Sequence, residues 1–176
     1  MSDTLITVIA IFLAAILMFV FPLLSVSERS DDISQLSVQT ATTEFVDNSR
    51  AIGKITMENY QKLISTISAT GNSYDVEMEV KVLDENIGKK SAWTQGTVIG
   101  ENVYYSIYTS QIVDEIQNNA NGIYQMKEGD IFSVSVKNTN KTLAQSIRSA
   151  FYSITGSDTY SIAAQHSGVV TATGSK

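Results

Sequence analysis

Three alternating carboxylates, Asp75, Glu77 and Glu79, are the residues of this sequence whose spacing best suits chemistry. In a strand, successive side chains point to opposite faces, so these three would share one face. Carboxylates grouped in this way can bind a cation or act as an acid–base pair. The same alternation is also typical of a solvated strand face, where like charges discourage pairing with another sheet edge. We interpret the three as a solvated face.

Other catalytic arrangements lack essential members in this sequence. His166 is the only histidine, and there is no cysteine. One histidine cannot supply a multi-histidine metal site, and no serine lies in the nucleophile motif that a Ser–His–acid triad uses. The absence of thiols excludes disulfides and cysteine-ligated metals, and no glycine-rich phosphate loop occurs. The sequence therefore predicts a non-enzyme without cofactor or metal, in which His166 is structural or partly exposed.

A concentration of aromatic residues is the candidate partner surface. Trp93, Tyr104, Tyr105 and Tyr108 lie in a stretch that has the composition of short strands or an ordered loop. Such residues bind sugars and protein partners when they are exposed. Packing within the core or within a loop is the interpretation that we favour over a partner surface.

The chain is organised around its first apolar run, residues 4–24, which contains no charged residue. A helix of about 20 such residues crosses a bilayer core of about 30 Å. A cleaved signal peptide is the alternative, and Ser25-Val26-Ser27 offers a small-x-small site for cleavage. The start of the chain has no Lys or Arg, and the run is longer than a signal core. We expect residues 1–27 to be a retained transmembrane anchor.

Small residues on this helix suggest a surface for helix packing. Thr7, Ala10 and Ala14 have the spacing that lets two membrane helices approach closely, although alanine is common in any apolar helix. Pro22 removes a backbone hydrogen bond and is expected to bend or loosen the last apolar turns.

Residues 28–53 are predicted to extend the anchor as a helix. Ser30 is the expected cap, Asp31 and Asp32 suit a first helical turn, and Gly53 is the expected stop. The predicted apolar stripe consists of Ile33, Leu36, Val38, Ala41, Phe45 and Val46. We expect one long rod, with Phe45 among the residues that pack it during assembly.

Residues 54–176 are predicted to form an α/β head. Helices are expected from Thr56, over residues 110–119, and from a cap at Thr139 or Asn140 through the stripe Leu143, Ile147, Ala150, Phe151 and Ile154 to Gly156. Strands are expected over residues 74–83, 130–137 and within 159–173. The predicted class is α+β, a small and mostly antiparallel sheet with helices on one face.

Charge and composition limit the classes of partner that this chain can bind. The net charge of −6 and the pI of about 4.7 disfavour nucleic acid, whose binding begins with neutralisation of phosphates. The bilayer is the expected partner of the anchor. We expect a single-pass protein of the cell membrane, with its polar, cysteine-free C-terminal domain on the extracytoplasmic side.

The whole chain resembles pilin-like proteins. The N-terminal run with Pro22, residues 42–56 and residues 69–86 are similar to membrane-anchored pilin-like proteins of tight-adherence (Tad/Flp-type, type IV pilus-like) loci of Gram-positive bacteria. The resemblance implies a structural or accessory subunit of a surface pilus or secretion assembly. Its partners would be other pilin-like subunits, including copies of itself, or a membrane assembly platform.

One departure from the prepilin pattern bears on this resemblance. Prepilins usually have a basic leader ending in Gly and a Glu within the apolar run, whereas this chain has no Gly before Gly53 and no Glu before Glu28. The resemblance therefore implies a minor or accessory subunit. The alternative is a membrane-tethered binding module for a cell-wall component or a membrane protein.

Overall fold

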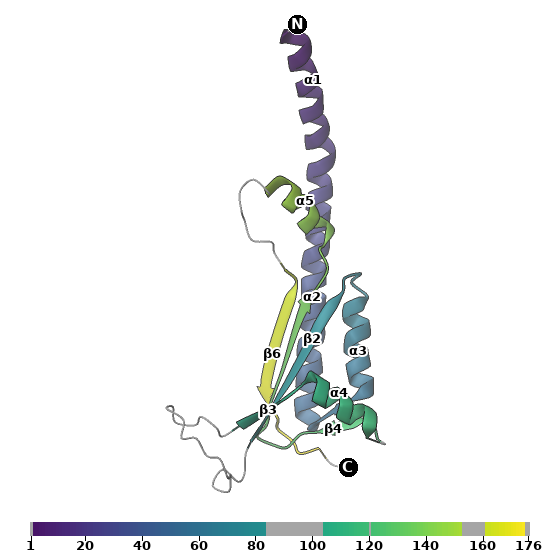
Figure 1. The fold of residues 1–176 in the computed structure, drawn as a ribbon, viewed down its shortest axis with the longest axis vertical. Coiled ribbons are helices and arrows are strands. Elements are labelled where there is room, and N and C mark those ends of the chain that lie inside the picture. Colours follow the sequence, from purple (N-terminus) through teal and green to yellow (C-terminus); the bar gives the residue numbers. More distant parts are fainter. Residues whose placement is uncertain (1, 84–103, 120, 153–160, 175–176) are drawn as a thin grey trace, which may run out of the picture.

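A computed structural model describes residues 2–83, 104–119, 121–152 and 161–174 of the 176-residue chain. The first 51 of these residues form one continuous rod, made of α1 (Ser2–Ala15), a π-helical turn η1 (Ile16–Val20) and α2 (Phe21–Ile52). Figure 1 shows the rod as the longest element, with the other described helices and strands gathered along α2. The predicted rod is therefore confirmed.

Two details of the rod follow from its sequence. Pro22 lies in the first turn of α2, directly after η1, so the expected loosening takes the form of a π-helical turn within an unbroken helix. Gly53 ends the helix in the left-handed conformation, with φ of 68°. The predicted cap at Ser30 is wrong, because Ser30 lies inside α2 and its carbonyl accepts a hydrogen bond from the Ser34 hydroxyl at 2.9 Å.

The main sheet has four antiparallel strands in the order β3-β2-β5-β6. Its members are β2 (Tyr74–Leu83), β3 (Tyr104–Tyr108), β5 (Ile131–Asn138) and β6 (Ala163–Val169). The period-two alternation of β2 predicts its bounds correctly, and its inward residues Val76, Met78 and Val80 are buried. Two strands of three residues, β1 (Lys54–Thr56) and β4 (Ile123–Gln125), form a separate pair.

The described part of the head also contains three shorter helices: α3 (Met57–Ser68), α4 (Thr109–Asn118) and α5 (Leu143–Tyr152). Thr56 caps α3 as predicted, its hydroxyl oxygen accepting from the Asn59 N–H at 3.2 Å. In Figure 1, α2 crosses behind β6, β5 and β2, α3 lies alongside it, and α5 contacts α2 nearer the N-terminus. The predicted α+β class, a long N-terminal helix followed by a small antiparallel sheet and further helices, is thus observed.

One hydrophobic core joins the rod to the sheet. Val38, Phe45 and Val46 of α2 pack in the same cluster as Phe132 and Val134 of β5. The Phe45 and Phe132 rings meet edge to face, with centroids 5.8 Å apart. Residues 28–53, predicted as an extension of the anchor, therefore share their core with the residues that follow.

The buried face of α2 differs from the predicted stripe. Ile33 and Leu36, expected to be inside, are each 65% exposed. Polar residues occupy much of the buried face instead: Ser27, Asp31, Ser34, Thr42 and Ser49. Hydrophobic periodicity misses this face for two reasons. The Ser34 and Thr42 hydroxyls are satisfied by carbonyls of their own helix, and the N-terminal part of α2 meets α5 and β6 through hydrogen bonds.

Those hydrogen bonds connect distant parts of the chain. The Thr142 hydroxyl donates to the buried Asp31 carboxylate at 2.6 Å. The Gln35 amide bonds both the N–H and the C=O of Ala163, at 3.0 and 2.7 Å. Arg148 pairs with Glu28 at 2.6 Å. Because each contact is specific, they fix the position of α5 and β6 along the rod.

The start of α5 also differs from prediction. Thr142 caps it, with reciprocal bonds from Gln145 N–H to the Thr142 hydroxyl at 3.2 Å and from Thr142 N–H to the Gln145 side chain at 3.1 Å. Asn140 instead accepts from the Ser73 N–H at 2.7 Å. Leu143 is 56% exposed, because Ala144 and Gln145 form the buried side. The side chains of Ala150 and Phe151, together with Ile154 and Gly156, lie outside the described residues.

Candidate functional site: assembly and docking surfaces

The N-terminal half of the rod exposes apolar side chains on all sides. Within the helix that continues to Ile52, the most apolar window of 18 residues contains no buried residue. In the part of the chain that the structure describes, this is the one helix long and apolar enough to cross a membrane. Fold and surface thus define a class: an α+β head carried on a rod whose N-terminal part has the dimensions of a membrane span.

The predicted small face lies within this exposed part. Thr7, Ala10 and Ala14 follow one another at spacings of three and four, which places them on one side of α1. The Thr7 hydroxyl donates to the Asp3 carbonyl at 2.7 Å, so its polar group is satisfied within its own helix. Pro22 is also exposed. The role of these residues in assembly stays a prediction.

A second exposed apolar surface lies further along the rod and was missed in the sequence. Val26 is 68% exposed, and Ile33 and Leu36 are 65% exposed, on the side of α2 opposite its buried residues. We call these three residues the outer stripe. Beside it, a groove of about 490 Å³ runs between α2 and the end of α3, lined in part by Val26, Ile33 and Ala69. Counting back from Phe45 in steps of three and four gives residues 42, 38, 34, 31 and 27, a phase that excludes Ile33 and Leu36 from the core.

Phe45 is placed inside the head. It is 5% exposed and lies against Phe132. Its packing role is therefore exerted within one chain, between the rod and the sheet.

His166 joins a charged cluster that ties β6 to α2. Its Nε2 lies 3.1 Å from Asp47 Oδ1, and Arg50 Nε donates to the same oxygen at 2.8 Å. The hydrogen bond from His166, followed by that from Arg50, lowers the pKa of the Asp47 carboxyl below its ordinary 3.8. This geometry matches the predicted structural, partly exposed histidine.

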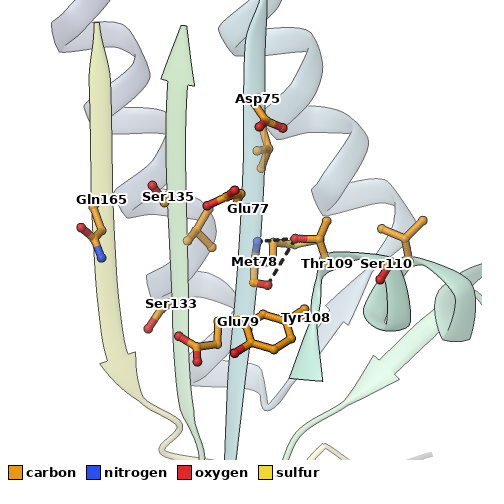
Figure 2. Close-up of a pocket in the computed structure, with 13 residues that line it drawn as sticks. Asp75, Glu77, Met78, Glu79, Tyr108, Thr109, Ser110, Ser133, Ser135 and Gln165 are labelled. Atoms are coloured by element: carbon orange, nitrogen blue, oxygen red, sulfur yellow. Dashed lines mark hydrogen bonds between the residues drawn. The ribbon is translucent and has the colours of Figure 1, made fainter. Parts of the chain in front are cut away.

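The alternating carboxylates stand on the sheet face opposite α2. Asp75 and Glu77 are exposed, and Glu79 accepts from the Ser106 hydroxyl at 2.7 Å. They line a groove of about 800 Å³. Tyr108 and Thr109 line the same groove on the side of β2 where α4 begins, as Figure 2 shows. Among the described residues, no group of three His, Asp or Glu side chains is placed to hold a metal ion. The solvated face predicted for these residues is the one observed.

The predicted aromatic surface is only partly assembled. Tyr104, Tyr105 and Tyr108 all lie on β3 and are 39%, 50% and 58% exposed. Alternation along the strand puts Tyr104 and Tyr108 on one face and Tyr105 on the other. Trp93 lies outside the described residues. The structure thus offers a tyrosine pair where the sequence suggested a set of four aromatics.

No family model, curated protein or solved structure matches this chain. Its function is therefore argued from the surfaces described above.

Proposed function

We propose that this protein is a pilin-like structural or accessory subunit of a surface pilus or secretion assembly. Its N-terminal helix would anchor it in the cell membrane, with the head on the extracytoplasmic side. The observation that carries the proposal is the outer stripe: apolar side chains continue beyond the span onto the outward side of α2, at Val26, Ile33 and Leu36.

The outer stripe supports contact between rods for an energetic reason. Burying one such aliphatic side chain contributes about 1.5–3 kcal/mol, so leaving three exposed along one helix forgoes several kcal/mol. A second rod laid along the stripe recovers this energy. Contiguous apolar surface on a water-facing element is typical of an interaction site.

The small face of α1 supports the same proposal within the bilayer. Lipid tails are as apolar as leucine, so helices associate there by close packing of small residues. Thr7, Ala10 and Ala14 would allow that approach, while the outer stripe would continue the contact outside the lipid.

Disulfide crosslinking in membranes tests the proposal directly, because the natural chain has no cysteine. Single substitutions Ala14→Cys and Ile33→Cys lie on the two proposed surfaces. Phe12→Cys, on the opposite side of α1, and Gln39→Cys, exposed beside the stripe, are the matched controls. We expect crosslinked dimers and higher species from the first pair and monomers from the controls. Equal crosslinking at all four positions, or none at any, would contradict the proposal.

The tethered binding module is the second candidate, favoured by the exposed pair Tyr104 and Tyr108. Such a pair on one sheet face suits stacking on a sugar of the cell wall. Binding of the full chain in detergent to purified cell wall should fall on Tyr108→Ala and persist on Tyr105→Ala, which lies on the other face. Absence of binding, or equal loss in both variants, would reject this candidate.

A further inference from the structure

The edge of β2 that faces α4 is only partly paired. β3 pairs with residues Glu79–Leu83 of β2 and then turns into α4. At the next residue, the Thr109 side chain replaces a strand: Met78 N–H donates to Thr109 Oγ1 at 2.6 Å, and Thr109 Oγ1 donates to the Met78 carbonyl at 3.2 Å. Beyond Met78, no described strand lies on this side of β2.

Strand geometry tells which backbone groups face that open edge. Along an antiparallel strand, the N–H and C=O groups of alternate residues point to opposite edges. Because those of Met78 point to Thr109, those of Val76 and Tyr74 point the same way. The backbone groups of the odd-numbered residues point toward β5 instead, as the hydrogen bond from Thr139 N–H to the Ser73 carbonyl at 2.9 Å confirms. The open edge therefore offers main-chain donors and acceptors at two successive alternate residues.

The groove of about 800 Å³ reaches this edge from the outer face of the sheet, where Ser133 and Ser135 of β5 and Gln165 of β6 also line it. Val76 is among its lining residues although its side chain faces the core. In Figure 2, Asp75, Glu77 and Glu79 form a column along β2, with Thr109 and Ser110 beside them where α4 begins.

The charge of the groove indicates which kind of segment would bind there. Its described lining contains three carboxylates and no Lys, Arg or His. Lys137 is the register partner of Asp75, but it approaches from β5, on the side away from the open edge. A strand added at the edge would set its outward side chains directly beside Asp75 and Glu77, where basic residues form favourable cross-strand pairs.

We infer that the open edge of β2 is a docking site for an extended segment of a partner protein that carries Lys or Arg at alternate positions. Such a segment adds a strand in line with β3, with main-chain hydrogen bonds giving affinity and alternate side chains giving specificity. The partner is a different protein, because none of the described strands of this chain carries two basic residues at alternate positions. This inference does not depend on the proposed assembly function.

Synthetic peptides test the site with the full chain in detergent micelles. The probe is a fluorescein-labelled Lys-Val-Lys-Val-Lys peptide, and binding is followed by fluorescence anisotropy. Its matched control replaces each Lys by Glu. Two further peptides carry N-methyl groups, one on the Lys amides and one on the Val amides, so that each blocks one edge of the peptide strand.

The inference expects the lysine peptide to bind at least about tenfold more tightly than the glutamate peptide. One N-methylated peptide should lose binding and the other keep it, because only one edge of the added strand pairs with β2. Glu77→Lys should weaken binding about tenfold, while Asp32→Lys, an exposed carboxylate on α2, should leave it within about twofold.

Four results would overturn the inference. They are no binding of the lysine peptide at millimolar concentration, equal binding of the glutamate peptide, equal effects of the two N-methyl sets, and unchanged binding in Glu77→Lys. Dimerisation of the chain that Glu77→Lys abolishes would instead assign the edge to a second copy, and so would also reject a basic partner segment.

Discussion

Replacing Phe45 by alanine measures how strongly the rod is joined to the head. Phe45 is 5% exposed and stacks edge to face on Phe132. Truncating a buried Phe costs about 3–5 kcal/mol, of which the aromatic pair supplies about 0.5–1.5 kcal/mol. Since domains of this size are stable by about 5–15 kcal/mol, Phe45→Ala should remove about a fifth or more of the stability.

Pulse proteolysis in increasing urea, on the chain in detergent, reports the free energy of unfolding of the head. Phe12→Ala is the matched control, because Phe12 is 67% exposed in the apolar half of the rod. We expect the control to stay within about 0.5 kcal/mol of the natural chain. A loss below about 1 kcal/mol in Phe45→Ala would refute the shared core of rod and sheet.

Three further predictions concern the contacts that position the head. The pKa of Asp47 in the folded chain lies below 3.8, so its carboxylate contributes stability that is present above pH 3.8 and is lost as the pH falls through the folded pKa. Urea titrations from about pH 5 to about pH 3 should therefore show a smaller loss of stability in Asp47→Asn than in the natural chain. Thr142→Val leaves the buried Asp31 carboxylate without its 2.6 Å donor and removes the cap of α5, so unfolding experiments should show a loss of about 1–3 kcal/mol, and an unchanged midpoint would reject that bond. Gly53→Ala should reduce the yield of folded protein far more than Gly71→Ala, because both have positive φ but only at Gly53 would a Cβ meet a backbone oxygen of the C-terminal segment; equal yields would be contrary evidence.

The parts of the fold that the sequence predicted well are those set by short-range periodicity. The ten-residue alternation of β2 gives its bounds and its inward face, because a period of two is hard to mistake over that length. The rod follows from an apolar run and a helical pattern that Gly53 terminates. The two three-residue strands, β1 and β4, are too short to leave such a pattern.

The parts that sequence reasoning missed depend on contacts between distant residues. The Thr142 hydroxyl, 111 residues later in the chain, donates to the buried Asp31 carboxylate. No local sequence pattern indicates such a pair. Two residues of the outer stripe, Ile33 and Leu36, are predicted to be in the core because they are apolar, although the phase set by Phe45 excludes them. The cap at Thr142 had a readable signal, since Thr142 and Gln145 have capping-box spacing.

The candidate surfaces also divide into those that the sequence predicts and those that depend on contacts between distant residues. His166 was expected to be structural and lies against Asp47, and the carboxylates of β2 were expected to be solvated and are. The open edge beside them was not foreseen, because it depends on where β3 stops and on a threonine side chain that closes one position of β2.

Membrane attachment is the most direct test of the proposed function, since contact between rods requires each rod to be held in the bilayer by its apolar half. Cells expressing the natural chain and a variant lacking residues 4–24 would be fractionated, and the membranes extracted with alkaline carbonate. The account predicts that the natural chain stays in the extracted membrane and that the shortened chain is released. Recovery of the natural, full-length chain in the soluble fraction would contradict it.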